Sequence, residues 1–352
     1  MLIYIALSAM PALLAIAFGD LTEKSKKRNY LLVCGMLLFL FMALRSYSVG
    51  SVDTRNYING MSQAIHADSW KNFYNPKGVE VGFQMYTFLL SRVFDNAQWI
   101  VVISSALAVF LTFWFIYKNS EDVALSVTLY ITVGAMTFCM QGMRQAIAMC
   151  LCLVAYELSK KRKPVLFALI IVLASLFHQT AIIFIIVYFA PLVKFNFQSF
   201  MCFLGVSIIA ILGSNTITSI ANEVFDKDYE LRVDSGGFFA VATYVVIILV
   251  ALLFNKKLKD GDRAESMMFY ITFLGFVCYV MRYFSVQQAE RISFYFLFGQ
   301  MILLPNSMQY LTTRERQISK LVAYVFAICL FLYRLNGSNF VPYEFFWQTP
   351  RL

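Results

Sequence analysis

The chain has 352 residues, of which 60% are hydrophobic, 17% aromatic and only 14% charged, and its formal net charge is +9. A soluble globular domain contains about 25% charged residues, so this composition excludes an ordinary soluble protein. Because every backbone group in lipid must be hydrogen-bonded internally, helices are the expected membrane spans. We therefore predict an all-α integral membrane protein that forms a single polytopic domain over residues 1–352.

Polar residues divide the chain into apolar stretches, which predict about twelve transmembrane helices, with a range of 10 to 13. A spanning helix needs about 20 mostly apolar residues, and several of these stretches are shorter. Their approximate bounds are 2–19, 30–44, 97–117, 122–140, 145–158, 165–177, 180–193, 198–213, 237–254, 266–284, 292–309 and 320–334.

Every second connection between these stretches carries basic residues. The positive-inside rule places such connections in the cytoplasm, and both termini then lie outside. The first stretch has no basic residue before it and a basic cluster after it, which is opposite to a signal peptide, so we expect it to remain as a span. The basic connections are Lys24 to Arg28, Lys118, Ser159 to Lys163, Lys194, Asn255 to Arg263, and Thr312 to Lys320.

The stretch from Val165 to Val193 is short for two helices, yet it must cross the membrane twice if the next basic connection is to stay inside. We therefore predict two short or broken helices that meet near Phe177-His178-Gln179-Thr180. Broken helices at membrane depth usually line a cavity.

Two connections on the outer side are long, at about residues 45–96 and 214–236. Within the first, residues 56–70 and 83–94 repeat apolar side chains at the spacing of one helical face. We expect both segments to be amphipathic helices that lie on the outer membrane surface.

Arginines recur at the predicted outer boundary, where the positive-inside rule disfavours them. Arg144 stands out because it follows the apolar run 123–140 and precedes the apolar run 146–158, and a charged residue so placed is a candidate functional residue. A guanidinium group matches phosphate or pyrophosphate bidentately, which suggests an anionic ligand. Alternatively, these arginines pair with outer acidic residues or snorkel. They are Arg45, Arg55, Arg92, Arg144, Arg232, Arg282 and Arg291.

Three further residues are candidates for acid–base chemistry at the same boundary. Asp53 and Glu80 can each act as a general base, although each also suits the start of a surface helix as a cap. His178, at the predicted helix break, can relay a proton or bind a phosphate or sugar, unless a backbone carbonyl satisfies it. Asp226-Lys227-Asp228 matches a metal-binding D-x-D pattern, but we interpret it as a solvated acidic loop.

Short motifs follow one another in order along most of the chain and are specific only as a series. They are Arg45 with Val49-Gly50, Asp53-Thr54 and Asn56-Tyr57; Glu80-Val81-Gly82-Phe83; Met143-Arg144-Gln145-Ala146; Leu176-Phe177-His178-Gln179-Thr180-Ala181; and Glu290-Arg291-Ile292-Ser293 followed by Leu304-Pro305. This succession resembles the Wzy-type polysaccharide polymerases, particularly their EpsG-like branch.

This resemblance implies a GT-C-like membrane glycosyltransferase that needs no metal or other cofactor. Such an enzyme joins oligosaccharide repeat units at the periplasmic face of the bacterial inner membrane, and undecaprenyl pyrophosphate is both the carrier and the leaving group. Its expected partners are the lipid-linked donor and acceptor, the bilayer, and a chain-length regulator and a flippase of the same pathway, with no nucleic acid. The expected catalytic residues are His178, Asp53 and Glu80, and the expected substrate-binding residues are Arg45, Arg55, Arg144, Gln145, Arg282, Glu290 and Arg291.

Two other functions remain open at this point. An O-antigen ligase uses the same donor but transfers the glycan to lipid A core. A flippase for the lipid-linked oligosaccharide also suits about twelve helices with a polar break. Against the flippase, the chain has no internal repeat between its halves, and its arginines gather at one face.

Overall fold

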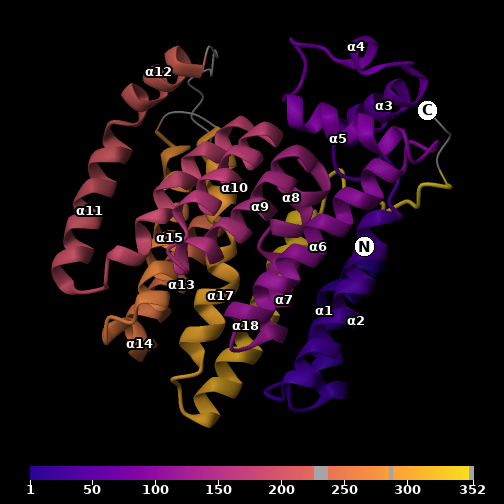
Figure 1. The fold of residues 1–352 in the computed structure, drawn as a ribbon. Helices are drawn as coiled ribbons and strands as arrows, with labels where there is room; N and C mark the ends of the chain where they lie inside the picture. Colours follow the sequence, from indigo (N-terminus) through magenta and orange to yellow (C-terminus); the bar gives the residue numbers. More distant parts are fainter. Residues whose placement is uncertain (226–236, 285–287, 349–352) are drawn as a thin grey trace. The chain divides into compact units, whose positions relative to one another are not determined.

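A computed structural model describes residues 1–225, 237–284 and 288–348 of the chain (Figure 1). In this part of the chain the regular structure is helical, and the only β pairing is an isolated bridge between Arg45 and Phe345. The predicted D-x-D segment, Arg232 and residues 226–236 of the second long connection lie outside the described residues.

Every apolar stretch predicted from the sequence coincides with a helical segment. Both predicted surface helices also form, as α3 and α5, with α4 between them. The segments are α1 Leu2–Phe18, α2 Lys24–Ala43, α3 Val52–His66, α4 Trp70–Phe73, α5 Val81–Ser91, α6 Trp99–Asn119, α7 Val123–Thr132, α8 Ala135–Gln141, α9 Met143–Lys160, α10 Pro164–Phe177, η1 Gln179–Tyr188, η2 Ala190–Leu192, α11 Phe197–Leu212, α12 Ser214–Phe225, α13 Phe238–Phe254, α14 Lys256–Lys259, α15 Arg263–Met281, α16 Gln288–Ser293, η3 Phe294–Phe296, α17 Phe298–Met308 and α18 Thr313–Leu335.

Three helices of the described chain, α6, α15 and α18, are long and apolar enough to cross a membrane. The count rises to five if the bent pairs α7 with α8 and α11 with α12 each form one broken span. The remaining apolar helices are shorter. The apolar helices support a helical membrane protein, while twelve crossings and a GT-C architecture stay predictions.

The predicted break between residues 177 and 180 is confirmed. Helix α10 ends at Phe177, and the chain continues as a 3₁₀ helix from Gln179, with His178 between them. A second break separates α7 from α8 at Gly134, where the helix axis bends by 48° and the glycine has a φ of +106°, which favours glycine.

The chain forms two compact units. Unit 1 contains residues 1–158, 164–182 and 322–352, and unit 2 contains residues 159–163 and 183–321. The division falls within α9, η1 and α18. The functional residues predicted from the N-terminal half belong to unit 1, and those near residue 290 belong to unit 2.

In unit 1 the basic connections gather at one end. Lys27 Nζ donates to the Ser120 carbonyl at 2.8 Å, which joins the first two basic connections. At the opposite end, Gln98 Nε2 donates to the carbonyls of Ala43 and Arg45, both at 3.0 Å, so residues 45–98 form an outer segment that closes on itself. Figure 1 shows α3, α4 and α5 of this segment together, beyond the end of α6.

Unit 2 also has its basic connections at one end. Ser159 Oγ lies 4.0 Å from Met267 Sδ, and the Phe195 amide donates to Ser266 Oγ at 2.9 Å, so three basic connections meet at the start of α15. The start of α13 meets the opposite end of α15. Each unit thus has a basic end and an opposite end, as the alternation of basic connections predicts.

Candidate functional site

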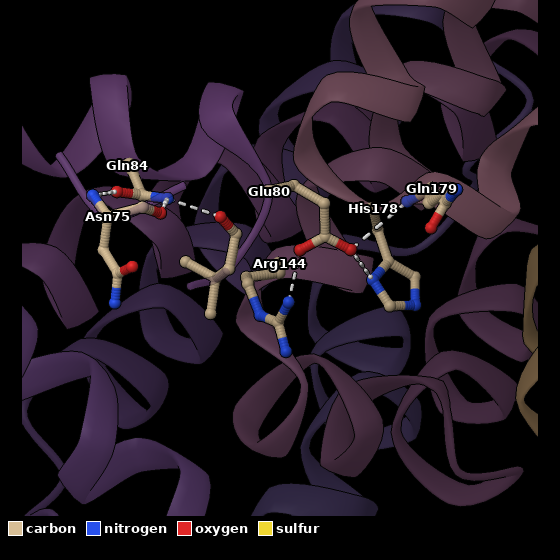
Figure 2. A network of polar contacts seen from close by, with 7 residues as sticks. Asn75, Glu80, Gln84, Arg144, His178 and Gln179 are labelled. Atoms are coloured by element: carbon tan, nitrogen blue, oxygen red, sulfur yellow. Dashed lines mark hydrogen bonds and ion pairs between the residues drawn. The ribbon is translucent and has the colours of Figure 1, made fainter. Parts of the chain in front are cut away.

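Three side chains from distant parts of unit 1 meet at its outer segment (Figure 2). The Glu80 carboxylate accepts a hydrogen bond from His178 Nδ1 at 3.0 Å through Oε1 and forms an ion pair with Arg144 Nη1 through Oε2. The backbone amide of Gln179 also donates to Oε1, at 3.3 Å. We call Glu80, Arg144 and His178 the Glu80 cluster.

The Glu80 cluster is partly open. The side chain of Glu80 is 21% exposed, that of Arg144 is 27% exposed and that of His178 is 17% exposed. A fully buried cluster of this kind would be a structural ion pair that no ligand could reach, whereas these side chains are accessible. The cluster therefore combines a fixed geometry with access for a ligand.

The local sequence explains why Glu80 reaches the other two residues. Glu80 occupies the N-cap position of α5, but its side chain makes no capping hydrogen bond to the helix, so the cap interpretation is wrong for this side chain. At Gly82 a Cβ atom would lie only 2.6 Å from the Leu176 carbonyl oxygen and 2.7 Å from Leu176 Cβ. Because Gly82 has no side chain, α5 packs directly on the end of α10, and this contact brings Glu80 to His178.

Gln84 holds the loop that leads into Glu80, as Figure 2 also shows. Its Oε1 accepts from the Asn75 amide at 2.9 Å, and its Nε2 donates to the carbonyls of Asn75 at 2.9 Å and Val79 at 2.5 Å. Gln84 is buried, so these bonds are shielded from water and fix residues 75–79.

We expect Gly82→Ala to destabilise the protein and to separate Glu80 from His178. The added methyl group would overlap backbone atoms, which cannot move aside, and overpacking of this kind costs about 1–3 kcal/mol. Unfolding in detergent and polymer synthesis measure the two effects. Gly60→Ala is the matched control, because Gly60 has no atom within 4 Å of its Cβ position; equal behaviour of the two variants would contradict the packing role of Gly82.

The environment of Glu80 favours its ionised form. Burial raises the pKa of the carboxyl, but the hydrogen bond from His178 and the charge of Arg144 outweigh burial and lower the pKa from 4.5 to about 2. Both carboxylate oxygens already accept from partners. The contacts therefore favour a role in orienting His178, while the predicted role of Glu80 as a general base stays a prediction.

This lowered pKa predicts how stability depends on pH. The ionised cluster contributes its full stability above a pH of about 4.5, and the contribution is lost as the pH falls toward about 2. We expect the difference in unfolding free energy between wild type and Glu80→Gln to be constant above about pH 5. This difference should shrink by on the order of 1 kcal/mol between about pH 4.5 and pH 3, because solvent screens part of the interaction. A difference that grows in acid would contradict the assignment.

Arg144 also has neighbours on α3. The Tyr57 hydroxyl from α3 hydrogen-bonds to it, and the Asp53 charge acts on the same hydroxyl one helical turn earlier. The Arg144 Nε is buried, and no hydrogen-bond partner for it exists among the described residues. A buried donor without a partner costs free energy, so this edge of the guanidinium group is suited to an anionic ligand.

The structure places Asp53 near the cluster but not in it. Asp53 lies in the first turn of α3, is exposed, and donates its backbone amide to Ser51 Oγ at 3.2 Å. Ser51 is the N-cap of α3, so the cap interpretation is also wrong for Asp53. Its predicted catalytic role remains a prediction.

The other residues predicted in unit 1 are not brought together with the Glu80 cluster in the same way. Arg45 is fully buried, and its guanidinium group donates to protein atoms. Arg55 is exposed and lies over the Tyr47 ring at 5.2 Å. Gln145 follows Arg144 directly but is buried. Their predicted roles in substrate binding stay predictions.

Two of the predicted residues of unit 2 pair at the end of that unit opposite its basic connections. Arg282 Nη1 pairs with Glu290 Oε2 at 2.7 Å and donates to the Tyr279 hydroxyl at 2.8 Å. Gly237 approaches these side chains so closely that a Cβ would lie 2.1 Å from the Tyr279 hydroxyl. Arg291 is exposed on α16. Arg282 and Glu290 therefore form the ion pair that was one of the alternatives for the outer arginines.

Comparison with known proteins identifies the family. A model of the EpsG family matches residues 28–345, which is most of the chain. The chain belongs to the EpsG family. No curated protein matched it, and no solved structure matched it. The family suggests a membrane protein with a polysaccharide polymerase role of the glycosyltransferase kind, in agreement with the resemblance seen in the sequence.

Sequence reasoning missed three residues that build the site of this EpsG-family protein. Tyr57 and Gly82 belong to the motifs named above, but the sequence predicts no role for either of them. Gln84 belongs to none of these motifs. Gly82 carried the clearest signal, because a glycine two residues after a conspicuous acid, at the start of a helix, indicates close packing. Nothing in the sequence indicates that Gln84 bonds to a loop five to nine residues earlier.

Proposed function

We propose that this EpsG-family protein is a polysaccharide polymerase that joins oligosaccharide repeat units carried on undecaprenyl pyrophosphate. The observation that carries the proposal is the Glu80 cluster. It combines a histidine, a carboxylate that orients this histidine, and an arginine with an unsatisfied donor. The proposed reaction takes place at the periplasmic face of the inner membrane and needs no metal.

In the proposed step, a hydroxyl group of the acceptor sugar attacks the anomeric carbon of the donor. A new glycosidic bond forms, and the bond between the anomeric carbon and the pyrophosphate oxygen breaks. The hydroxyl proton passes to His178, and the electron pair leaves with undecaprenyl pyrophosphate. Arg144 stabilises the negative charge that develops on this leaving group.

The hydrogen bond between Glu80 and His178 supports the choice of His178 as the base. A carboxylate can only accept, so Nδ1 of His178 carries the proton of this bond. In the neutral ring Nε2 then has the free lone pair and can accept the proton of the hydroxyl group. Glu80 thereby sets both the tautomer and the orientation of the ring.

The outer arginines support an anionic substrate. Arg144 pairs with Glu80 through Nη1, while its buried Nε has no hydrogen-bond partner among the described residues. Guanidinium groups bind phosphate oxygens through two adjacent N–H donors. The cluster lies at the end of unit 1 opposite the basic connections. This position supports a site outside the cytoplasm, together with periplasmic termini, through the positive-inside rule.

Synthesis by the purified protein tests the proposal. The full-length protein in detergent would receive synthetic undecaprenyl-pyrophosphate repeat units with a metal chelator, and the products would be separated as a ladder on a gel. Wild type should give a ladder, Arg144→Ala should not, and Lys71→Ala, which removes an exposed cation of the outer segment, should behave as wild type.

Other outcomes would point elsewhere. No ladder from folded wild-type protein would favour the ligase or the flippase. Transfer of the glycan to added lipid A core would identify a ligase, whereas movement of lipid-linked units across vesicle membranes without new bonds would identify a flippase. A full-length ladder from normally folded Arg144→Ala would remove Arg144 from the mechanism.

A further inference from the structure

Arg45 is among the largest fully buried side chains of the described chain. Both of its terminal nitrogens donate to backbone carbonyls, while its Nε has no hydrogen-bond partner among the described residues. Nη2 donates to the Met140 carbonyl at 2.8 Å. Nη1 donates to the Met42 carbonyl and lies 3.3 Å from Ser105 Oγ. No carboxylate of the described residues pairs with it. This buried cation is therefore stabilised by neutral acceptors, of which two are backbone carbonyls.

These carbonyls belong to the ends of two helices. Met42 is in the last turn of α2, and Met140 is in the last turn of α8. Carbonyls in the last turn have no partner within the helix and carry the negative end of the helix dipole. A single guanidinium group thus joins the C-terminal ends of α2 and α8.

The C-terminal tail keeps Arg45 in this position. Residues 339–346 run back along residues 44–50, and we call the two segments together the clasp. The Ser46 amide donates to the Glu344 carbonyl at 2.8 Å, and the Phe346 amide donates to the Leu44 carbonyl at 2.9 Å, on either side of Arg45. These pairings close the clasp over the backbone of Arg45.

A third backbone pairing lies within the clasp, where the Gly50 amide donates to the Asn339 carbonyl at 2.9 Å. Side chains tie the clasp to the rest of unit 1: the Tyr343 hydroxyl donates to the Phe41 carbonyl at 2.6 Å. The Tyr4 hydroxyl donates to the Phe340 carbonyl at 2.6 Å, so the first helix is tied to it as well.

The clasp leads directly to the turn that carries Arg144. Thr54 Oγ1 donates to the same Met140 carbonyl at 3.2 Å, and Gln141 Nε2 donates to the Gly50 carbonyl at 3.3 Å. Helix α8 ends at Gln141 and α9 begins at Met143, so Arg144 is only four residues beyond the carbonyl that Arg45 holds.

We propose that Arg45 is a positioning residue for Arg144: it holds the Met140 carbonyl at the end of α8, and the C-terminal tail seals it in place. The functional part of this inference rests on the proposed polymerase reaction. It replaces the sequence-based expectation that Arg45 binds substrate, because the guanidinium group is fully buried and already donates to protein atoms. The tail then contributes to activity without contributing a residue to the Glu80 cluster.

Two substitutions that act on the same carbonyl test the inference. Thr54→Val is nearly isosteric and removes one donor to Met140 without touching Arg45. Arg45→Lys keeps the charge but cannot span the two helix ends. Ser105→Ala is the matched control, because it removes a contact of Arg45 that does not lead to Met140.

The first readout does not depend on the proposed reaction. Hydrogen exchange of the full-length protein in detergent, followed by mass spectrometry, reports on the amides of residues 141–147. We expect exchange there to speed up at least tenfold in Arg45→Lys and several-fold in Thr54→Val, and to stay unchanged in Ser105→Ala. Unchanged exchange in both test variants would overturn the proposal.

The second readout uses the coupling rate with lipid-linked repeat units. Misplacing a catalytic group lowers kcat more than it raises KM, so we expect kcat to fall on the order of tenfold in Arg45→Lys with KM nearly unchanged. A raised KM with normal kcat would overturn positioning in favour of direct binding. If wild type made no polymer, the proposed function would fail, and the exchange measurement would still decide whether Arg45 fixes the turn.

Discussion

Replacing His178 by alanine should reduce polymer synthesis by about 10²–10⁴-fold while the protein still folds and still binds its lipid-linked donor. This is the usual contribution of a positioned general base. The ring is held through Nδ1 by Glu80 at 3.0 Å, so its loss removes the proton acceptor but leaves the ion pair between Glu80 and Arg144. Initial coupling rates and donor binding by the purified protein measure the two expectations separately.

The second histidine of the chain supplies the control. His66 lies on α3, is exposed, and its Nδ1 hydrogen-bonds to the Ser62 carbonyl at 2.8 Å. His66→Ala should therefore keep wild-type rates. If His178→Ala kept more than about a tenth of the wild-type rate, the base would have to be another group, and Asp53 would be the next residue to replace.

Glu80→Gln separates orientation from proton transfer. Glutamine keeps an oxygen that can accept from His178, but it loses the charge that pairs with Arg144. A fall in rate smaller than that of His178→Ala is expected if Glu80 only orients the ring. An equal or larger fall would return Glu80 to the list of candidate bases.

The sequence predicted the helices well because the signal is local. Polar punctuation between apolar stretches indicated where each helix begins and ends, and the break at His178 followed from the short stretch 165–193 together with the alternation of basic connections. The number of membrane crossings is harder to obtain, since segments such as Pro164–Phe177 are too short to cross by themselves. Length and composition decide whether a helix can span, but its neighbours decide whether it does.

The sequence predicts the residues of the Glu80 cluster but not the contacts between them. Arg144, Glu80 and His178 were all singled out from the sequence, since each is a polar residue at an apolar boundary. Their meeting depends on Gly82 packing against Leu176, and a contact between residues so far apart in the chain leaves no periodic signal. Close packing of two helix backbones is a tertiary contact, which local helix propensity does not predict.

Arg45 shows a second limit of the same reasoning: sequence does not distinguish a buried arginine from an accessible one. It borders an apolar stretch, as Arg144 does, so the same reasoning predicts a binding role for both. The difference lies in burial: residues 339–346 pair with the backbone on either side of Arg45, whose side chain is fully buried, whereas the side chain of Arg144 is 27% exposed. Nothing near residue 45 indicates that a segment almost 300 residues later will cover it.

Replacing Arg144 by lysine should lower the coupling rate by about 10²–10³-fold, although the positive charge is retained. A guanidinium group offers donors on two edges, so it can pair with Glu80 on one edge and face a phosphate on the other, whereas an ammonium group is a single point charge. Loss of one preorganised donor to a developing charge costs about 3–4 kcal/mol. Arg92→Lys is the control: Arg92, in the same outer segment, lies over the Phe88 ring at 4.6 Å and should affect stability more than rate.

A double-mutant cycle then distinguishes the two possible tasks of Arg144. If Arg144 serves only to hold Glu80, the combination of Arg144→Lys and Glu80→Gln should be no worse than Glu80→Gln alone, because both remove the same ion pair. If Arg144 also binds the leaving group, Arg144→Lys should lower the rate further in the Glu80→Gln background. We expect this second result, because the unpaired Nε lies on the edge of Arg144 that the ion pair leaves unused. Strict equality of the double and single variants would mean that Arg144 acts only by holding Glu80, and it would overturn the proposed contact between Arg144 and the leaving group.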